Sequence, residues 1–193
     1  MDINCLSFSY LELEMDTLYL VLDGLYANEK KYILKKGPFK MSLPIRQATG
    51  GRYFPKVVFF IPKCCKNKTI MISNYADGWM TLGNKISNES STFHYNFRLS
   101  KNVNENFINS LMYWNSGKNQ RVIYTMKDPK WMFYEQGDTL WFEELENYQK
   151  RLIKDRLNFE ILVSYCKKLG INILDNDFFN SEENAIYLEQ ISW

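Results

Sequence analysis

Residues 92–99 read TFHYNFRL and carry the clearest strand pattern in this sequence. Apolar and polar side chains alternate at every position, as they do in a β-strand that has one apolar and one polar side. The apolar set is Phe93, Tyr95, Phe97 and Leu99, and the polar set is His94, Asn96 and Arg98. This stretch therefore predicts a strand of an antiparallel sheet.

Further short strands are predicted after this stretch. Residues 115–119 read NSGKN, a composition typical of a hairpin loop, and Asp128-Pro129 and residues 136–138 are turn signals. The middle of the chain therefore predicts a meander of four or five antiparallel strands. Besides residues 92–99, the predicted strands are Leu111–Trp114, Arg121–Met126, Trp131–Tyr134 and Thr139–Phe142. The segment Trp131–Tyr134 is apolar on both faces, which suits either a covered central strand or a binding surface.

The residues before this meander are also predicted to be mostly β, with one short helix. Val57–Ile61 and Thr69–Ile72 are apolar runs separated by a polar turn, which favours a buried hairpin. Residues 77–87 place Trp79, Leu82 and Ile86 at helical spacing, with Asp77 as the expected N-cap. The other predicted strands are Phe8–Leu13 and Leu18–Leu22, which we expect to pair, and Tyr32–Leu34.

The pattern changes to helix at Glu143. Acidic residues precede basic ones from Glu143 to Arg156, which is the order that the helix dipole favours. Asn158 is expected to cap a second helix, Phe159–Leu169, which Gly170 ends. We predict an α+β fold: one domain over residues 1–193, with a largely antiparallel meandering sheet and a C-terminal helical pair packed on one face. Residues 1–142 are mostly β, 143–170 are helical and 171–193 form an acidic tail.

Charge is strongly segregated along the chain, although the net charge is only +2. Residues 1–28 carry −5, residues 29–68 carry +10, and residues 170–193 carry −5. The basic segment therefore faces either the acidic ends of this chain or an acidic partner. Because it also contains aromatic residues, it is a candidate for binding nucleic acid, but the sequence pI of about 8.2 is low for a dedicated nucleic-acid domain.

Cysteine and histidine content limits the chemistry that this chain can perform. The four cysteines contain no C-x-x-C pair and His94 is the only histidine, so a structural zinc site is not expected. The simplest interpretation is that all four cysteines are reduced thiols in a reducing compartment. His94 could serve as a general base for a cysteine, but a histidine in mid-strand is more often structural. Nucleotide-binding, hydrolase and metalloprotease motifs are absent from the sequence.

We therefore expect a non-catalytic, cytoplasmic, bacterial protein that binds a partner protein, such as an immunity or antitoxin partner of a toxin. No cofactor, bound metal or membrane association is expected, and the oligomeric state stays open. One alternative is a nucleic-acid binder that uses residues 29–68. The other is an enzyme whose site lies around residues 128–143, where four carboxylates lie near Trp131, Tyr134 and Trp141. The predicted partner-binding residues are Tyr32, Lys35, Lys36, Arg46, Arg52, Tyr53, Trp131, Tyr134 and Trp141.

Overall fold

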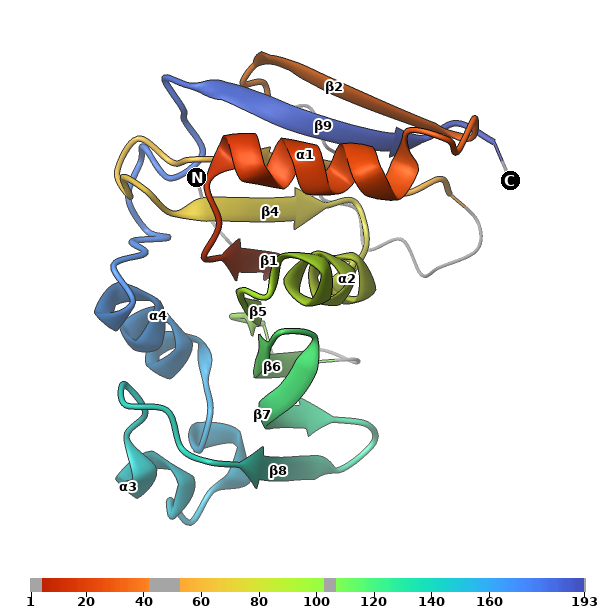
Figure 1. The fold of residues 1–193 in the computed structure, drawn as a ribbon. Coiled ribbons are helices and arrows are strands. Elements are labelled where there is room, and N and C mark those ends of the chain that lie inside the picture. Colours follow the sequence, from red (N-terminus) through yellow and green to blue (C-terminus); the bar gives the residue numbers. More distant parts are fainter. Residues whose placement is uncertain (1–4, 42–52, 103–106, 193) are drawn as a thin grey trace.

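The computed structural model describes residues 5–41, 53–102 and 107–192 and contains one antiparallel sheet of nine strands (Figure 1). The order across the sheet is β2-β9-β3-β4-β1-β5-β6-β7-β8. The strands are β1 (Cys5–Leu11), β2 (Tyr32–Pro38), β3 (Lys56–Phe60), β4 (Thr69–Ser73), β5 (Phe93–Ser100), β6 (Phe107–Asn115), β7 (Lys118–Lys127), β8 (Trp131–Gly137) and β9 (Asn184–Gln190). The predicted α+β class with a largely antiparallel sheet is confirmed.

Half of the sheet is a meander and half is not. Strands β5 to β8 follow one another in sequence and in space, as predicted, and β3 and β4 form the expected hairpin. Strand β1, however, lies between β4 and β5, and β9 lies between β2 and β3. The acidic tail therefore supplies an interior strand of the sheet.

Helices cover both faces of this sheet (Figure 1). Helices α1 (Met15–Tyr26) and α2 (Met80–Ser90) pack on one face, where Leu18, Leu22 and Ile86 join a buried apolar cluster. Helix α4 (Phe159–Lys168) packs on the other face against β5 and β6. The sheet thus separates two apolar cores, one under each helical layer.

Local signals explain where two of the helices begin and end. Asn158 caps α4 as predicted, because its Oδ1 accepts a hydrogen bond from the backbone N–H of Ile161 at 2.9 Å. Gly170 follows α4 with a φ of +78°, a conformation that favours glycine. At α2, Asp77 instead accepts a hydrogen bond from the N–H of Trp79, and Trp79 itself occupies the N-cap position.

Three predicted elements differ in the structure. Residues 18–22, predicted as a strand, belong to α1, because Leu18 and Leu22 are buried at i, i+4 spacing while Leu20 is 70% exposed. Residues 139–142 form no strand. The C-terminal helical pair is not confirmed, since residues 143–158 hold only the one-turn helix α3 (Leu145–Tyr148) and the 3-10 turn η1 (Ile153–Asp155).

Gly83 allows α2 to approach the sheet closely. A Cβ at this position would lie 2.3 Å from Cε1 of His94 on β5.

Gly83→Ala should therefore lower the free energy of unfolding by about 1–3 kcal/mol, as overpacking does. Gly24→Ala in α1 is the matched control, because no heavy atom lies within 4 Å of its added methyl group. We expect this control to be neutral or stabilising by up to about 1 kcal/mol. Urea unfolding of both variants tests the contact, and equal stabilities would contradict it.

Candidate functional site

The predicted partner-binding residues lie at opposite edges of the sheet. Tyr32, Lys35 and Lys36 are on β2, and Trp131 and Tyr134 are on β8, with seven strands between them. Tyr53 is close to β3, and Trp141 follows β8 in the chain. Arg46 and Arg52 lie outside the described residues. The structure therefore does not bring the predicted residues near β2 and those near β8 together on one surface.

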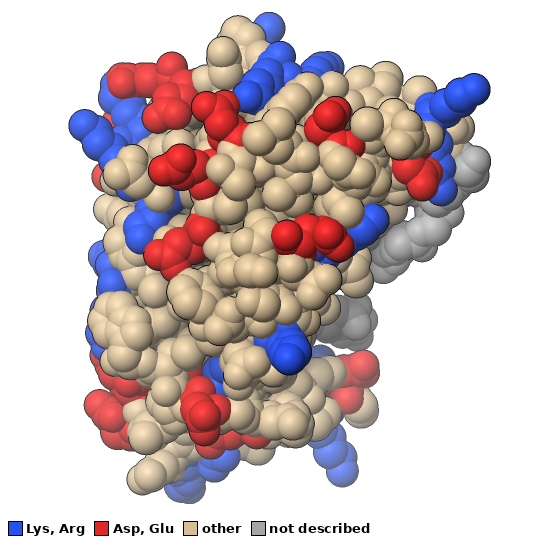
Figure 2. All heavy atoms as spheres, in the orientation of Figure 1, with Lys and Arg blue, Asp and Glu red and all other residues tan. Residues whose placement is uncertain are grey.

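The basic side chains near β2 pair with the acidic ends of the chain. Lys36 Nζ lies 2.8 Å from Asp16 Oδ1, and this hydrogen bond lowers the pKa of Asp16. The C-terminal acidic segment supplies partners to Lys56 and Lys63, which pair with Glu189 and Glu182. Figure 2 shows Lys and Arg interspersed with Asp and Glu on the face that carries α1 and α2. Part of the charge available to a nucleic-acid backbone is thus already neutralised.

Exposed apolar side chains gather instead near β8. Five of the eleven exposed large apolar residues in the described part of the chain fall within residues 132–152, and they define what we call the β8 end of the sheet. They are Met132, Tyr134, Trp141, Leu145 and Leu152. Trp141 is the most exposed at 74%, and its ring meets the buried ring of Phe142 edge-on. Tyr134 and Trp141 were predicted from the sequence as partner-binding residues, whereas Met132, Leu145 and Leu152 were not.

On the sheet face that carries α1 and α2, the part formed by β6, β7 and β8 that α2 leaves uncovered also carries partly exposed apolar side chains. Cross-strand register defines this open face by three rows, which are Ile108–Met126–Met132, Ser110–Tyr124–Tyr134 and Met112–Val122–Gln136. Only Ser110 among these nine residues is buried. The rings of Tyr124 and Tyr134 stack with centroids 5.3 Å apart. Tyrosine and methionine on an open sheet face are typical of a protein interface.

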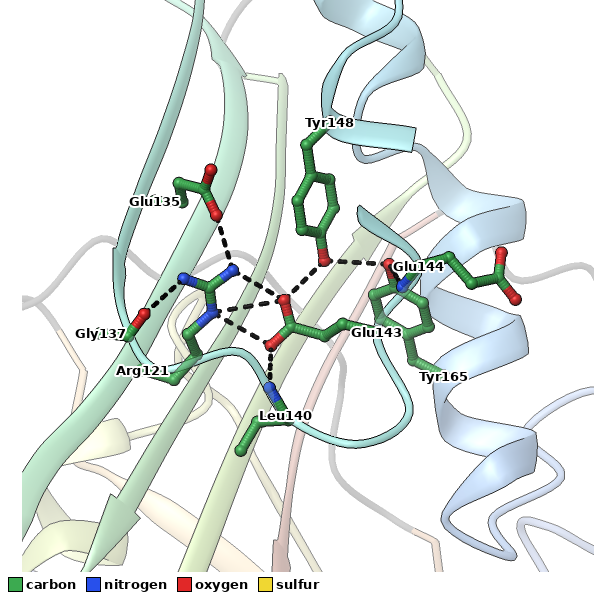
Figure 3. A network of polar contacts seen from close by, with 8 residues as sticks. All are labelled: Arg121, Glu135, Gly137, Leu140, Glu143, Glu144, Tyr148 and Tyr165. Atoms are coloured by element: carbon green, nitrogen blue, oxygen red, sulfur yellow. Dashed lines mark hydrogen bonds and ion pairs between the residues drawn. The ribbon is translucent and has the colours of Figure 1, made fainter. Parts of the chain in front are cut away.

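A buried ion pair lies on the opposite face of β7 and β8 (Figure 3). The guanidinium of Arg121 contacts Glu143 through Nε at 3.0 Å and through a terminal nitrogen at 2.7 Å. Its remaining contacts are Glu135 at 2.7 Å and the carbonyl of Gly137 at 2.9 Å. Although burial opposes the charged form, these glutamates raise the pKa of Arg121. Arg121 is therefore a charged group with partners on β8 and on the segment that follows it.

Glu143 is hydrogen-bonded on several sides. Its carboxylate accepts from the N–H of Leu140 at 3.0 Å and from the hydroxyl of Tyr148 at 2.7 Å. Burial, followed by the contact with Tyr165, raises the pKa of Tyr148 and keeps its hydroxyl protonated. The network joins β7, β8, α3 and α4 in one rigid unit. It holds the segment that contains Trp141 against the sheet.

The four carboxylates of the predicted enzymatic site, Asp128, Glu135, Asp138 and Glu143, are not all brought together. Glu135 and Glu143 bind the same guanidinium. Asp128 precedes β8 and Asp138 follows it, so more than the length of that strand, roughly 20 Å, separates them. Paired carboxyl groups in glycosidases stand about 5–10 Å apart. Asp128 and Asp138 are too far apart for this, while Glu135 and Glu143 are counter-charges of Arg121.

His94 is buried between β5 and α2. Its Nδ1 lies 3.0 Å from Asn84 Oδ1, and its Nε2 lies 2.9 Å from the hydroxyl of Ser9. An amide oxygen can only accept, so Nδ1 carries the proton and Nε2 accepts from Ser9. The ring stacks on Trp114, and desolvation lowers its pKa to about 3. The hydrogen-bond partners of this neutral histidine are amide and hydroxyl groups, as suits a packing residue.

A polar cleft of about 870 Å³ opens at the end of β1 and β4, beside the start of α1. Its lining combines four acidic residues and three lysines, which are Glu12, Glu14, Asp16, Glu183, Lys36, Lys66 and Lys68. Lys36 is paired with Asp16, and Lys68 donates to the hydroxyl of Tyr10. Within the described ranges, no group of three or more histidine, cysteine or acidic side chains is arranged to hold a metal ion. The mixed charge selects no single class of ligand.

Comparisons with protein families, with curated proteins and with solved structures find no match to this chain. Among the described residues, no helix is both long enough and apolar enough to cross a bilayer. The β8 end is the candidate functional site, with exposed Met132 and Tyr134 on the open face and exposed Trp141, Leu145 and Leu152 in the segment that follows β8.

The low pKa of His94 predicts a pH dependence of stability. Between about pH 6.5 and the folded pKa of about 3, the unfolded chain binds a proton that the folded chain does not. The free energy of unfolding should therefore fall as pH is lowered through this window. His94→Gln, which stays neutral, should lose less stability over the same range. Urea unfolding at several pH values measures both slopes, and parallel slopes would show that His94 does not contribute.

Replacing Glu143 should be far more costly than replacing Glu135. Glu143→Gln leaves buried Arg121 without its main counter-charge and should destabilise the protein by about 3–5 kcal/mol. Glu135→Gln is the control, because the side chain of Glu135 is 42% exposed and water can replace it, at a cost of about 1 kcal/mol or less. Chemical denaturation of the two variants checks this order, and a larger effect at Glu135 would contradict it.

Proposed function

We propose that this chain is a non-catalytic protein-interaction protein whose binding surface is the β8 end of the sheet. The observation that carries the proposal is that five exposed large apolar side chains come from β8 and from the segment that Arg121 and Glu143 tie to it, namely Met132, Tyr134, Trp141, Leu145 and Leu152. Trp and Tyr supply most of the binding energy in protein interfaces. A rigid support lowers the entropy lost when such side chains are immobilised by a partner.

Trp141 is the best candidate for the central anchor of this surface. Its side chain is largely exposed, while the adjacent Phe142 is 1% exposed and packs into the core beside Tyr165. Glu143, the next residue, is held by Arg121. An exposed indole that precedes two buried residues is presented in a defined position and needs little ordering on binding.

The internal contacts of the polar residues favour binding over catalysis. Glu135, Glu143 and His94 are each engaged by neighbouring groups of the fold. Several lysines of residues 29–68 form ion pairs with acidic segments of the same chain, which weakens the case for nucleic-acid binding. The narrower idea of an immunity or antitoxin protein stays a prediction, and a toxin gene beside this one would support it.

A comparative pull-down from the native host tests this function. Tagged wild-type protein should retain a defined host protein, and Trp141→Ala should reduce its recovery roughly tenfold or more, as loss of a central anchor does. Leu20→Ala is the matched control, because Leu20 is 70% exposed and lies on α1, which packs beside β2 at the opposite edge of the sheet. The control should retain the same protein in full. Recovery of nucleic acid alone, or equal losses with both variants, would refute the proposal.

A further inference from the structure

The two edge strands of the sheet differ in how they meet solvent. Strand β2 carries exposed Lys35 and Lys36 and ends at Pro38, and lysine and proline on an edge discourage pairing with another chain. Strand β8 reads WMFYEQG and has neither. An exposed apolar edge without such protection is normally covered by another strand.

Strand β8 is also regular and rigid. It pairs with β7 over all seven residues without a bulge, and no other strand in the described part of the chain pairs with its outer edge. Its one charged side chain, Glu135, could have repelled a neighbouring strand, but Arg121 neutralises it from within the fold. The edge is therefore a preformed template for one more antiparallel strand.

We propose that the occupant of this edge is a second copy of the chain, with the two β8 strands antiparallel about a two-fold axis through Tyr134. The inference goes beyond the proposed function, because it uses the strand edge and leaves Trp141 free for another partner. Such a dimer would continue the sheet from one copy into the other, and isologous pairing of this kind closes on itself.

The charged residues that flank β8 favour one register of this strand pair. An axis through Tyr134 brings Lys130, which directly precedes β8, towards Asp138 of the partner subunit, which follows Gly137 at the end of β8, twice in the dimer, and sets Met132 opposite Gln136 of the partner subunit. No ion pair within the described residues engages Lys130 or Asp138. Directly opposed unlike charges stabilise a strand pair and like charges destabilise it.

The neighbouring registers are worse on the same criterion. An axis through Phe133 or through Glu135 would shift Lys130 out of line with Asp138 of the partner subunit, so neither register gains this contact. The Tyr134 register also extends the stacked row of Tyr124 and Tyr134, whose rings are 5.3 Å apart in one copy, into the corresponding row of the other. The two open faces then form one continuous surface.

Charge reversal tests both the dimer and its register. Sedimentation velocity over a roughly hundredfold concentration range should show a reversible dimer for the wild type. Lys130→Glu or Asp138→Lys alone should raise the dissociation constant roughly tenfold, because each turns two attractions into two repulsions. The double variant Lys130→Glu/Asp138→Lys should restore dimerisation. Lys118→Glu, an exposed charge reversal in the β6–β7 turn region, should leave it unchanged.

Site-specific cross-linking gives a second readout of the axis. Tyr134→Cys places two thiols opposite each other, so oxidised glutathione should yield a covalent dimer by thiol–disulfide exchange, with reduced glutathione released. Gln136→Cys faces Met132 of the partner subunit and should not cross-link.

Three results would overturn the proposal: a monomer at every concentration, a dimer insensitive to the single charge reversals, or a double variant as weak as the single ones. Trp141→Ala should sediment like the wild type, so failure of this inference is distinguishable from failure of the proposed function. Circular dichroism of each variant confirms that the fold is kept.

Discussion

The buried contact between Arg121 and Glu143 supports everything at the β8 end of the sheet. Removing two charges from water costs several kcal/mol each, and that cost is offset only where the remaining hydrogen-bonding capacity is filled. Here Gly137, Leu140, Glu135 and Tyr148 fill it. The same contacts connect the last hairpin to α4, so an edge strand and an irregular segment are tied to the helix on that face of the sheet.

The strand order places the acidic and basic segments of the sequence next to each other. Strand β9, from the acidic C-terminal segment, lies between β2 and β3 of the basic segment, and α1 from the acidic N-terminal segment lies beside β2. Regions of opposite charge that are far apart in the chain are thus adjacent in space. Opposite charges therefore cancel locally, on the side of the molecule that carries β2, and not only in the sum over the whole chain.

Sequence patterns predicted local elements well and long-range placement poorly. The alternation in residues 92–99 identified β5, and Asn158 and Gly170 marked the ends of α4, because these signals act within a few residues. The apolar run around Leu18 fits either a strand or a helix, and only packing against the sheet decides for the helix. His94 lies on the polar side of its strand yet is buried, because α2 covers that side through Gly83.

The candidate site shows the same division. Trp141 and Tyr134 were chosen as interface residues from their residue type, but the sequence did not indicate which aromatic residues are exposed, and the role of Glu143 depended on Arg121, which is 22 residues away. The nine-strand order could not be predicted, because the insertion of β9 between β2 and β3 involves residues about 150 positions apart in the chain. The separation of the two predicted residue groups to opposite edges follows from that order.

The position of β9 has a consequence for how the chain folds. Strand β2 has no neighbour in the sheet other than β9, and the outer side of β3 is also covered only by β9 among the described strands. During synthesis β2 must wait unpaired, and β3 paired only with β4, until residues 184–190 leave the ribosome. Pairings of such long sequence separation are entropically expensive to close and make folding slow. The lysines of β2 then oppose aggregation of this strand while it has no partner.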